Sequence, residues 1–171
     1  MSPGTGRSPQ LSLRLDGNQP DPAGRWHEGA TLAYLGGSLR VVLGKAQREA
    51  VRDGDTLGLP LPPQATPRQI QDRAEAWLRA EAKRLLLQVI AQKAALAGRR
   101  APRLAISFAA RGHWVEVHDS ESLRCNWRLI EQPLSVIEQA VMRGISALPC
   151  TGDELDLFGG SSAVPAHEIK R

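Results

Sequence analysis

The chain has 171 residues, 42% of them apolar, and a formal net charge of +4 from 22 basic and 18 acidic side chains. This length suits a single domain with a core, so wholesale disorder is excluded, and no apolar run approaches the roughly 20 residues that span a bilayer. Two cysteines without a CxxC pair exclude a disulfide scaffold, and without a signal-peptide pattern we expect a cytoplasmic location.

The first part of the chain predicts a leader followed by two hairpins. Residues 1–25 are rich in Pro, Gly and Ser and are expected to be flexible, although Leu11–Leu15 alternates like a short strand. From Ala30 onward, apolar residues alternate on either side of two turn signals, Gly36–Gly37 and Asp53–Asp55. The strands expected in these hairpins are residues 32–35, 39–43, 49–52 and 56–61.

The strongest predicted element is a helix from Thr66 to about Ala97. Thr66 and Gln69 have the spacing of a capping box, Pro67 suits the first helical position, and Gly98 is typical of a C-terminal stop. The expected apolar stripe consists of Ile70, Ala74, Trp77, Leu78, Leu85 and Val89. Most cations lie off this stripe, which leaves two interpretations. One is a solvated face of ion pairs, which the interspersed carboxylates favour, and the other is a surface that binds nucleic acid weakly.

Short strands are expected after this helix. Residues 104–108 place Leu, Ile and Phe in alternation with small residues, as in a half-buried strand. Residues 113–118 and 123–130 predict a hairpin. Cys125 lies on the apolar face of its second arm, where a buried small hydrophobic residue is the simplest interpretation.

A second, shorter helix is predicted from Pro133 to Leu148, and Pro149 ends it. Residues 150–171 are again rich in Gly, Ser and Pro, so we expect a flexible tail. The domain is therefore expected to cover residues 26–149. Together these elements predict an α+β fold, with a small, mostly antiparallel sheet, one long helix and one shorter helix.

The sequence around the second helix is similar to that of a known family. Asn126–Ile130, followed by Pro133 and Val136–Glu138, resembles the strand and the HExxH-bearing helix of the YgjP-like family of predicted zinc metallopeptidases. The resemblance extends over about residues 26–148, and it implies a zincin-like arrangement, a peptidase activity and a bound zinc ion. The further matching segments are Tyr34–Gly36, Leu39–Leu43, Ala76–Leu78 and Arg84–Leu85.

The zinc site that this resemblance implies has lost its residues. When the helices are aligned, Arg143 takes the place of the first zinc-binding His, Gly144 of the catalytic Glu and Ala147 of the second His. A guanidinium stays protonated and cannot bind zinc, and the other two positions offer no donor atom. The family's third His falls near Asp153–Glu154, where a lone carboxylate does not rebuild the site. We therefore expect no zinc and a catalytically inactive domain that is either a binding protein or vestigial.

The alternative is a metal-dependent peptidase of the same family that works through an unrecognised site. The sequence assigns no residues to it. His113 and His118 point to opposite faces of one predicted strand, and two ligands such as His118 and Cys125 do not make a zinc site. The chain also lacks a GxSxG elbow, a P-loop and a GxGxxG motif after a strand.

A short motif in the tail suggests a protein partner. Residues 154–158, Glu-Leu-Asp-Leu-Phe, are similar to the peptide, approximately QLxLF, with which bacterial proteins bind the sliding clamp. Such a peptide inserts apolar anchors into pockets of its partner, and here the anchors would be Leu155, Leu157 and Phe158. The second interpretation is that these side chains pack on the domain's own core. Glu154 departs from the consensus Gln and favours this second interpretation.

Overall fold

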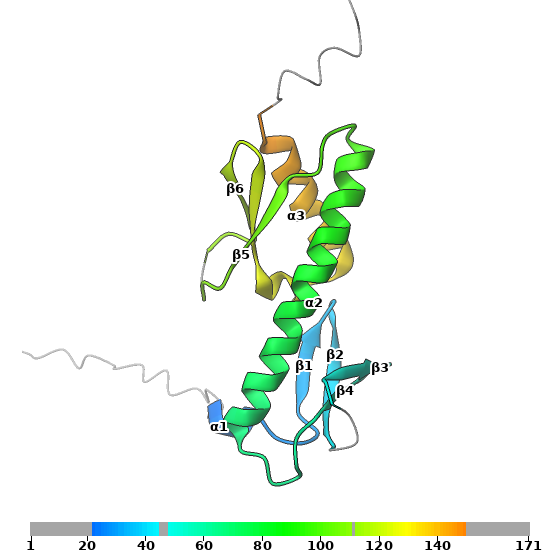
Figure 1. The fold of residues 1–171 in the computed structure, drawn as a ribbon, viewed down its shortest axis with the longest axis vertical. Helices are drawn as coiled ribbons and strands as arrows, with labels where there is room; N and C mark the ends of the chain where they lie inside the picture. Colours follow the sequence, from blue (N-terminus) through cyan, green and yellow to red (C-terminus); the bar gives the residue numbers. More distant parts are fainter. Residues whose placement is uncertain (1–21, 45–47, 111, 150–171) are drawn as a thin grey trace, which may run out of the picture.

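In the computed structural model, the described residues (22–44, 48–110 and 112–149) form two β-sheets at opposite ends of one long helix (Figure 1). The long helix α2 spans Pro67–Leu96, and the shorter helix α3 spans Leu134–Ala147 beside its second half. This arrangement confirms the predicted α+β fold. The remaining elements are α1 (Pro22–Arg25), β1 (Thr31–Tyr34), β2 (Gly37–Leu43), β3 (Val51–Asp53), β4 (Thr56–Leu59), β5 (Arg103–Ser107), β6 (Val115–Asp119), β7 (Ser122–Asn126) and the 3₁₀-helix η1 (Trp127–Glu131).

The strands divide into two sheets, where the sequence predicted one. Sheet A has the order β1-β2-β4-β3 and sheet B the order β5-β7-β6. The three hairpin pairs are antiparallel as expected, but β2 pairs with β4 and β5 pairs with β7 in parallel. Turn residues predict which strands form a hairpin, but they carry no information on how one hairpin joins the next strand.

The long helix begins and ends as predicted. The Thr66 side chain accepts a hydrogen bond from the Gln69 backbone at 3.3 Å, and the Gln69 side chain accepts one from the Thr66 backbone at 2.9 Å. Gly98 follows the helix with a φ of 63°. These local contacts stabilise the two ends independently of the rest of the fold.

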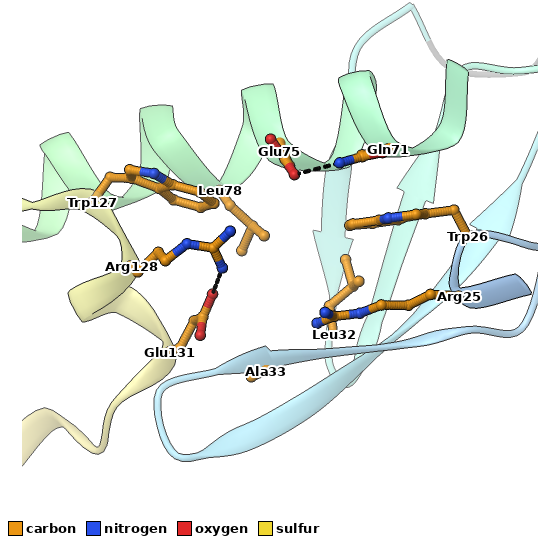
Figure 2. Close-up of a pocket in the computed structure, with 10 residues that line it drawn as sticks. All are labelled: Arg25, Trp26, Leu32, Ala33, Gln71, Glu75, Leu78, Trp127, Arg128 and Glu131. Atoms are coloured by element: carbon orange, nitrogen blue, oxygen red, sulfur yellow. Dashed lines mark hydrogen bonds and ion pairs between the residues drawn. The ribbon is translucent and has the colours of Figure 1, made fainter. Parts of the chain in front are cut away.

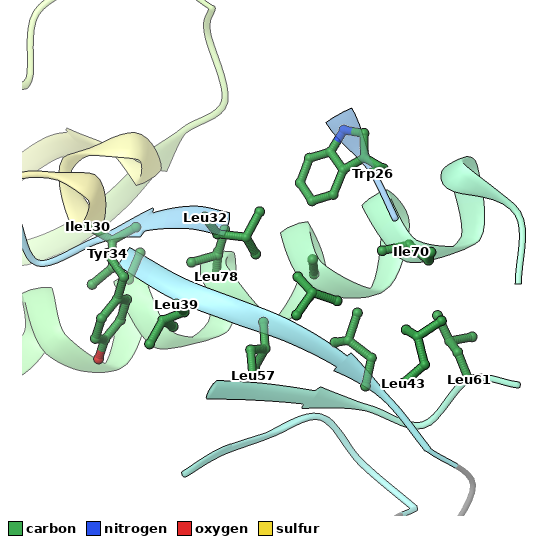
Figure 3. Close-up of a cluster of buried hydrophobic side chains, with 14 of the residues drawn as sticks. Trp26, Leu32, Tyr34, Leu39, Leu43, Leu57, Leu61, Ile70, Leu78 and Ile130 are labelled. Carbon is green, nitrogen blue, oxygen red and sulfur yellow. The ribbon is translucent and has the colours of Figure 1, made fainter. Parts of the chain in front are cut away.

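One continuous stripe of α2 packs on two hydrophobic clusters in turn. Its first half covers sheet A together with Trp26 and Ile130 (Figure 3), and its second half contacts sheet B and α3. Trp77 and Leu85, which were expected in the stripe, are half-buried beside it. The buried residues of α2 are Ile70, Ala74, Leu78, Ala82, Leu86, Val89, Ile90 and Ala94.

The first hairpin turns one residue earlier than predicted. Leu35 and Gly36, with φ values of 47° and 78°, occupy the turn, while Gly37 already belongs to β2. The reason is a tertiary contact: the backbone N–H groups of Leu35 and Gly36 donate to the carbonyls of Ile130 and Glu131 at 2.8 and 3.2 Å. Contact with η1 therefore decides which residues turn.

The strand predicted for residues 123–130 ends at Asn126, so the second half of that prediction is wrong. The Asn126 side chain accepts a hydrogen bond from the Arg128 backbone at 3.0 Å and donates one to the Ala109 carbonyl at 3.0 Å. This cap starts η1, which buries Trp127, Leu129 and Ile130 from a helical turn. Phe108 also departs from its predicted strand, because it lies beyond β5 and is 64% exposed.

Candidate functional site

A hollow of about 370 Å³ lies between β6 and α3. Its strand side consists of residues 113–117, and its helix side consists of Ala140, Arg143, Gly144 and Ala147. These four helical positions share one face because they are three or four residues apart. The structure therefore brings together, around one cavity, the three positions that the sequence resemblance assigned to the zinc motif.

Gly144 is buried where the helix meets sheet B. A Cβ atom at this position would lie 2.7 Å from Val115 Cγ1 and 3.3 Å from each Leu123 Cδ atom. Real Cβ contacts are longer than the first of these distances, so any side chain here would force Val115 or the backbone that carries it to shift. The position aligned with the catalytic Glu thus has no room for a carboxylate without a change in packing.

The charged groups of the hollow do not form a set of metal ligands. Glu116 is engaged by Arg124 at 3.3 Å, and Arg124 also contacts His118 Nδ1 at 2.6 Å. Arg143 is exposed, and within the described ranges it has no hydrogen-bond or ion-pair partner. His113 is the one imidazole in the lining. A guanidinium repels a dication, and a single imidazole beside a paired carboxylate falls short of the three protein ligands of a catalytic zinc.

Within the described residues, no group of three or more His, Cys, Asp or Glu side chains is placed to hold a metal ion. In the same part of the chain, no helix is long and apolar enough to cross a membrane. The candidate residues of the tail, Glu154, Leu155, Leu157 and Phe158, lie outside the described residues, as does the strand-like Leu11–Leu15.

A second cavity, of about 340 Å³, lies between β1, the first half of α2 and η1 (Figure 2). No sequence motif indicates this cavity, because its lining comes from separate elements of the chain. Both of its carboxylates are already paired, Glu75 with Arg79 at 2.7 Å and Glu131 with Arg128 at 3.0 Å. The same two guanidinium groups lie 5.2 and 4.8 Å from the centre of the Trp127 ring. The two carboxylates of this cavity therefore already have cationic partners within the protein. The lining residues are Arg25, Trp26, Leu32, Ala33, Gln71, Glu75, Leu78, Trp127, Arg128 and Glu131.

Several cations of α2 are also paired. Three of the pairs lie within α2 and the fourth joins α2 to α3, and weak nucleic-acid binding by this helix stays a prediction. The pairs are Arg68–Asp72 at 4.0 Å, Arg79–Glu75 at 2.7 Å, Arg84–Glu81 at 2.7 Å and Lys93–Glu138 at 2.9 Å.

A half-buried polar cluster joins α2 to sheet A. The Tyr34 hydroxyl donates to Glu81 at 3.0 Å and accepts from Arg52 at 3.3 Å. The hydrogen bond from Arg84 lowers the pKa of Glu81, whereas burial raises the pKa of Tyr34. Cys125, predicted to be a buried hydrophobic residue, is fully buried, and burial raises the pKa of its thiol to about 12. None of these groups belongs to the lining of the hollow between β6 and α3.

Comparison with protein families identifies the chain. A family model described as YgjP-like, metallopeptidase domain, matches residues 11–142. The chain belongs to the YgjP-like family. No curated protein and no solved structure matches it. The match to the YgjP-like family ends one residue before Arg143, so it covers β6 and the first part of α3 but stops short of the three positions aligned with the zinc motif.

Membership of the YgjP-like family confirms the resemblance read from the sequence, and its description implies a bound metal ion. The described residues around the hollow do not fit that ion. Its helix side presents a guanidinium, a glycine and a methyl group, and the glycine is closed in by Val115 and Leu123. No metal-dependent step can be derived for this site.

Proposed function

We propose that this YgjP-like domain has no metallopeptidase activity and that it acts by binding a partner. The single observation that carries the proposal is the joint placement of Arg143, Gly144 and Ala147 around the hollow between β6 and α3. These are the positions at which the family resemblance requires two imidazoles and a carboxylate.

The chemistry of zinc peptidases explains why these replacements matter. Two imidazoles one helical turn apart hold the ion, and a nearby carboxylate removes a proton from the metal-bound water. Arg143 supplies a positive charge in place of the first ligand, and Gly144 supplies no base. An exposed methyl group at Ala147 supplies no second ligand.

A binding role is supported by what remains of the site. The hollow is present with a volume of about 370 Å³, and exposed side chains surround it. We also propose a cytoplasmic location, which suits the free thiol of Cys125. Contact of Leu155, Leu157 and Phe158 with a sliding clamp stays a separate proposal, as does weak nucleic-acid binding by α2.

Metal analysis of the purified full chain tests the proposal. We expect no stoichiometric zinc by elemental analysis after purification without chelators, and no chelator-sensitive hydrolysis of casein. The double variant Arg143→His with Ala147→His is a positive control for metal uptake, because its two new imidazoles, one turn apart, join His113 in the same hollow and give it three nitrogen donors. One tightly bound zinc per unaltered chain, or chelator-sensitive hydrolysis by it, would instead support a peptidase with an unrecognised site.

A further inference from the structure

We propose that the hollow between β6 and α3 binds an extended acidic segment of a partner protein, with Arg143 as the anchor for one Asp or Glu side chain. The inference rests on the proposed function, since it assigns the former catalytic face to binding. It adds the chemistry of the partner and the residue that selects it.

The charges around the hollow are complementary to a carboxylate. Arg143 has no hydrogen-bond or ion-pair partner in the described part of the chain, whereas the one carboxylate of the lining, Glu116, is held by Arg124. His113 lies in the same lining and carries no negative charge in either protonation state. A guanidinium with unused donors forms two parallel hydrogen bonds with a carboxylate, which makes it selective for acidic side chains.

The strand side of the hollow can accept another strand. β6 is an outer strand of sheet B, and within the described residues only β7 pairs with it. The Trp114 carbonyl accepts a hydrogen bond from the Asn126 backbone at 2.9 Å. Because backbone groups alternate in an antiparallel pair, Val115 and Val117 direct their N–H and C=O groups away from β7. An extended peptide can pair with this edge.

Exposed apolar side chains lie where such a peptide would pass. Trp114 is 42% exposed and Val117 is 41% exposed, and both line the hollow. Large exposed aromatic side chains beside a concave surface are typical anchors of protein interfaces.

The shape favours an internal acidic residue over a terminal carboxylate. The lining follows five consecutive residues, 113–117, of which the last three belong to β6, and it follows α3 from Ala140 to Ala147. Arg143 lies midway along this length. A bound segment therefore continues past Arg143 in both directions, and the residue that meets the guanidinium has neighbours on either side.

Fluorescence anisotropy with labelled peptides tests the inference. The probe is a nine-residue peptide of alternating Thr and Val with one central Glu, acetylated and amidated at its ends. We expect the full chain to bind it about tenfold more tightly than the same peptide with a central Gln. Arg143→Ala should remove this preference, while Arg73→Ala, which removes an exposed cation from the distant half of α2, should preserve it.

Two further experiments separate the contribution of the Arg143 charge from that of backbone pairing with β6. Arg143→Glu should reverse the preference, so that a peptide with central Lys binds better than the one with Glu. N-methylation of the peptide amides that face β6 should abolish binding, whereas methylation of the alternate amides should be tolerated, because only one set pairs with the strand edge.

Three results would overturn the inference: equal binding of the Glu and Gln peptides, equal effects of Arg143→Ala and Arg73→Ala, or a requirement for a free C-terminal carboxylate. The failure of the proposed function is a different result. If the chain holds stoichiometric zinc, the proposed function is refuted, whatever peptide the chain prefers. If the chain is free of zinc and does not prefer the Glu peptide, only the inference about the acidic segment is refuted.

Discussion

Replacing Gly144 with Ala tests the close packing of Val115 and Leu123 on Gly144, which leaves no room for a longer side chain at this position. In an exposed helix, this substitution stabilises the protein by about 1 kcal/mol, because Ala has the higher helix propensity. At Gly144 the new methyl group would meet Val115 Cγ1 at 2.7 Å. We therefore expect the substitution to destabilise the domain.

The magnitude follows from the two side chains that oppose the methyl group. Val115 is β-branched and stiff about χ1, and Leu123 is fully buried, so neither can move aside freely. Overpacking of this kind costs typically 1–3 kcal/mol, and a cost of about 2 kcal/mol outweighs the propensity gain by about 1 kcal/mol. For a chain of 171 residues, the melting temperature should fall by about 2–4 °C.

Urea unfolding followed by far-ultraviolet circular dichroism measures this change in a double-mutant cycle. In a Val115→Ala background the opposing methyl group is gone, and Gly144→Ala should then stabilise the domain, which gives a coupling of about 2 kcal/mol. Ser146→Ala, at an exposed position of α3, is the control for helix propensity and should stabilise by a few tenths of a kcal/mol. If Gly144→Ala alone stabilised the domain by the full propensity gain, the close packing of β6 on α3 would be refuted.

Two further predictions concern titratable groups. In a Cys150→Ala variant, Cys125 should resist thiol reagents until the protein unfolds, because burial raises its pKa to about 12. In the unfolded chain the thiol ionises near its ordinary pKa of 9.0, so the free energy of unfolding should fall as the pH rises above 9.0. Rapid labelling of Cys125 in the native protein would contradict its burial. Glu81→Gln should cost about 1 kcal/mol in urea unfolding at neutral pH, since it removes a charge-assisted hydrogen bond from Arg84. The pKa of Glu81 is lowered in the folded state, so this deficit should shrink as the pH falls through that pKa, and a deficit that is the same in acid would refute the assignment.

The elements predicted best are those whose signals are local. The ends of α2 follow from Thr66, Gln69 and Gly98, which act within one turn of the helix. The face that α3 turns to the hollow follows from the spacing of Arg143, Gly144 and Ala147, so the sequence alone placed these residues together. Helical periodicity and capping need no knowledge of the rest of the fold.

The features that escaped prediction depend on contacts between distant segments. The turn at Leu35–Gly36 is set by hydrogen bonds to η1, and the end of β7 is set by a cap that Asn126 makes with Arg128 and Ala109. The division into two sheets rests on two parallel pairings that no turn signal specifies. The close approach of Val115 to Gly144 has the same origin.

Because two separate hydrophobic clusters pack along α2, some surface positions can change during evolution without affecting the core. The cluster on sheet A contains none of the residues that line the hollow between β6 and α3. Arg143 and Ala147 are exposed, so exchanging either one alters the hollow without disturbing either cluster. A lineage can therefore change what this surface recognises while the fold persists, provided that Gly144 is kept. Under the proposed binding role, such exchanges at the exposed positions are the route by which new partner specificities can arise.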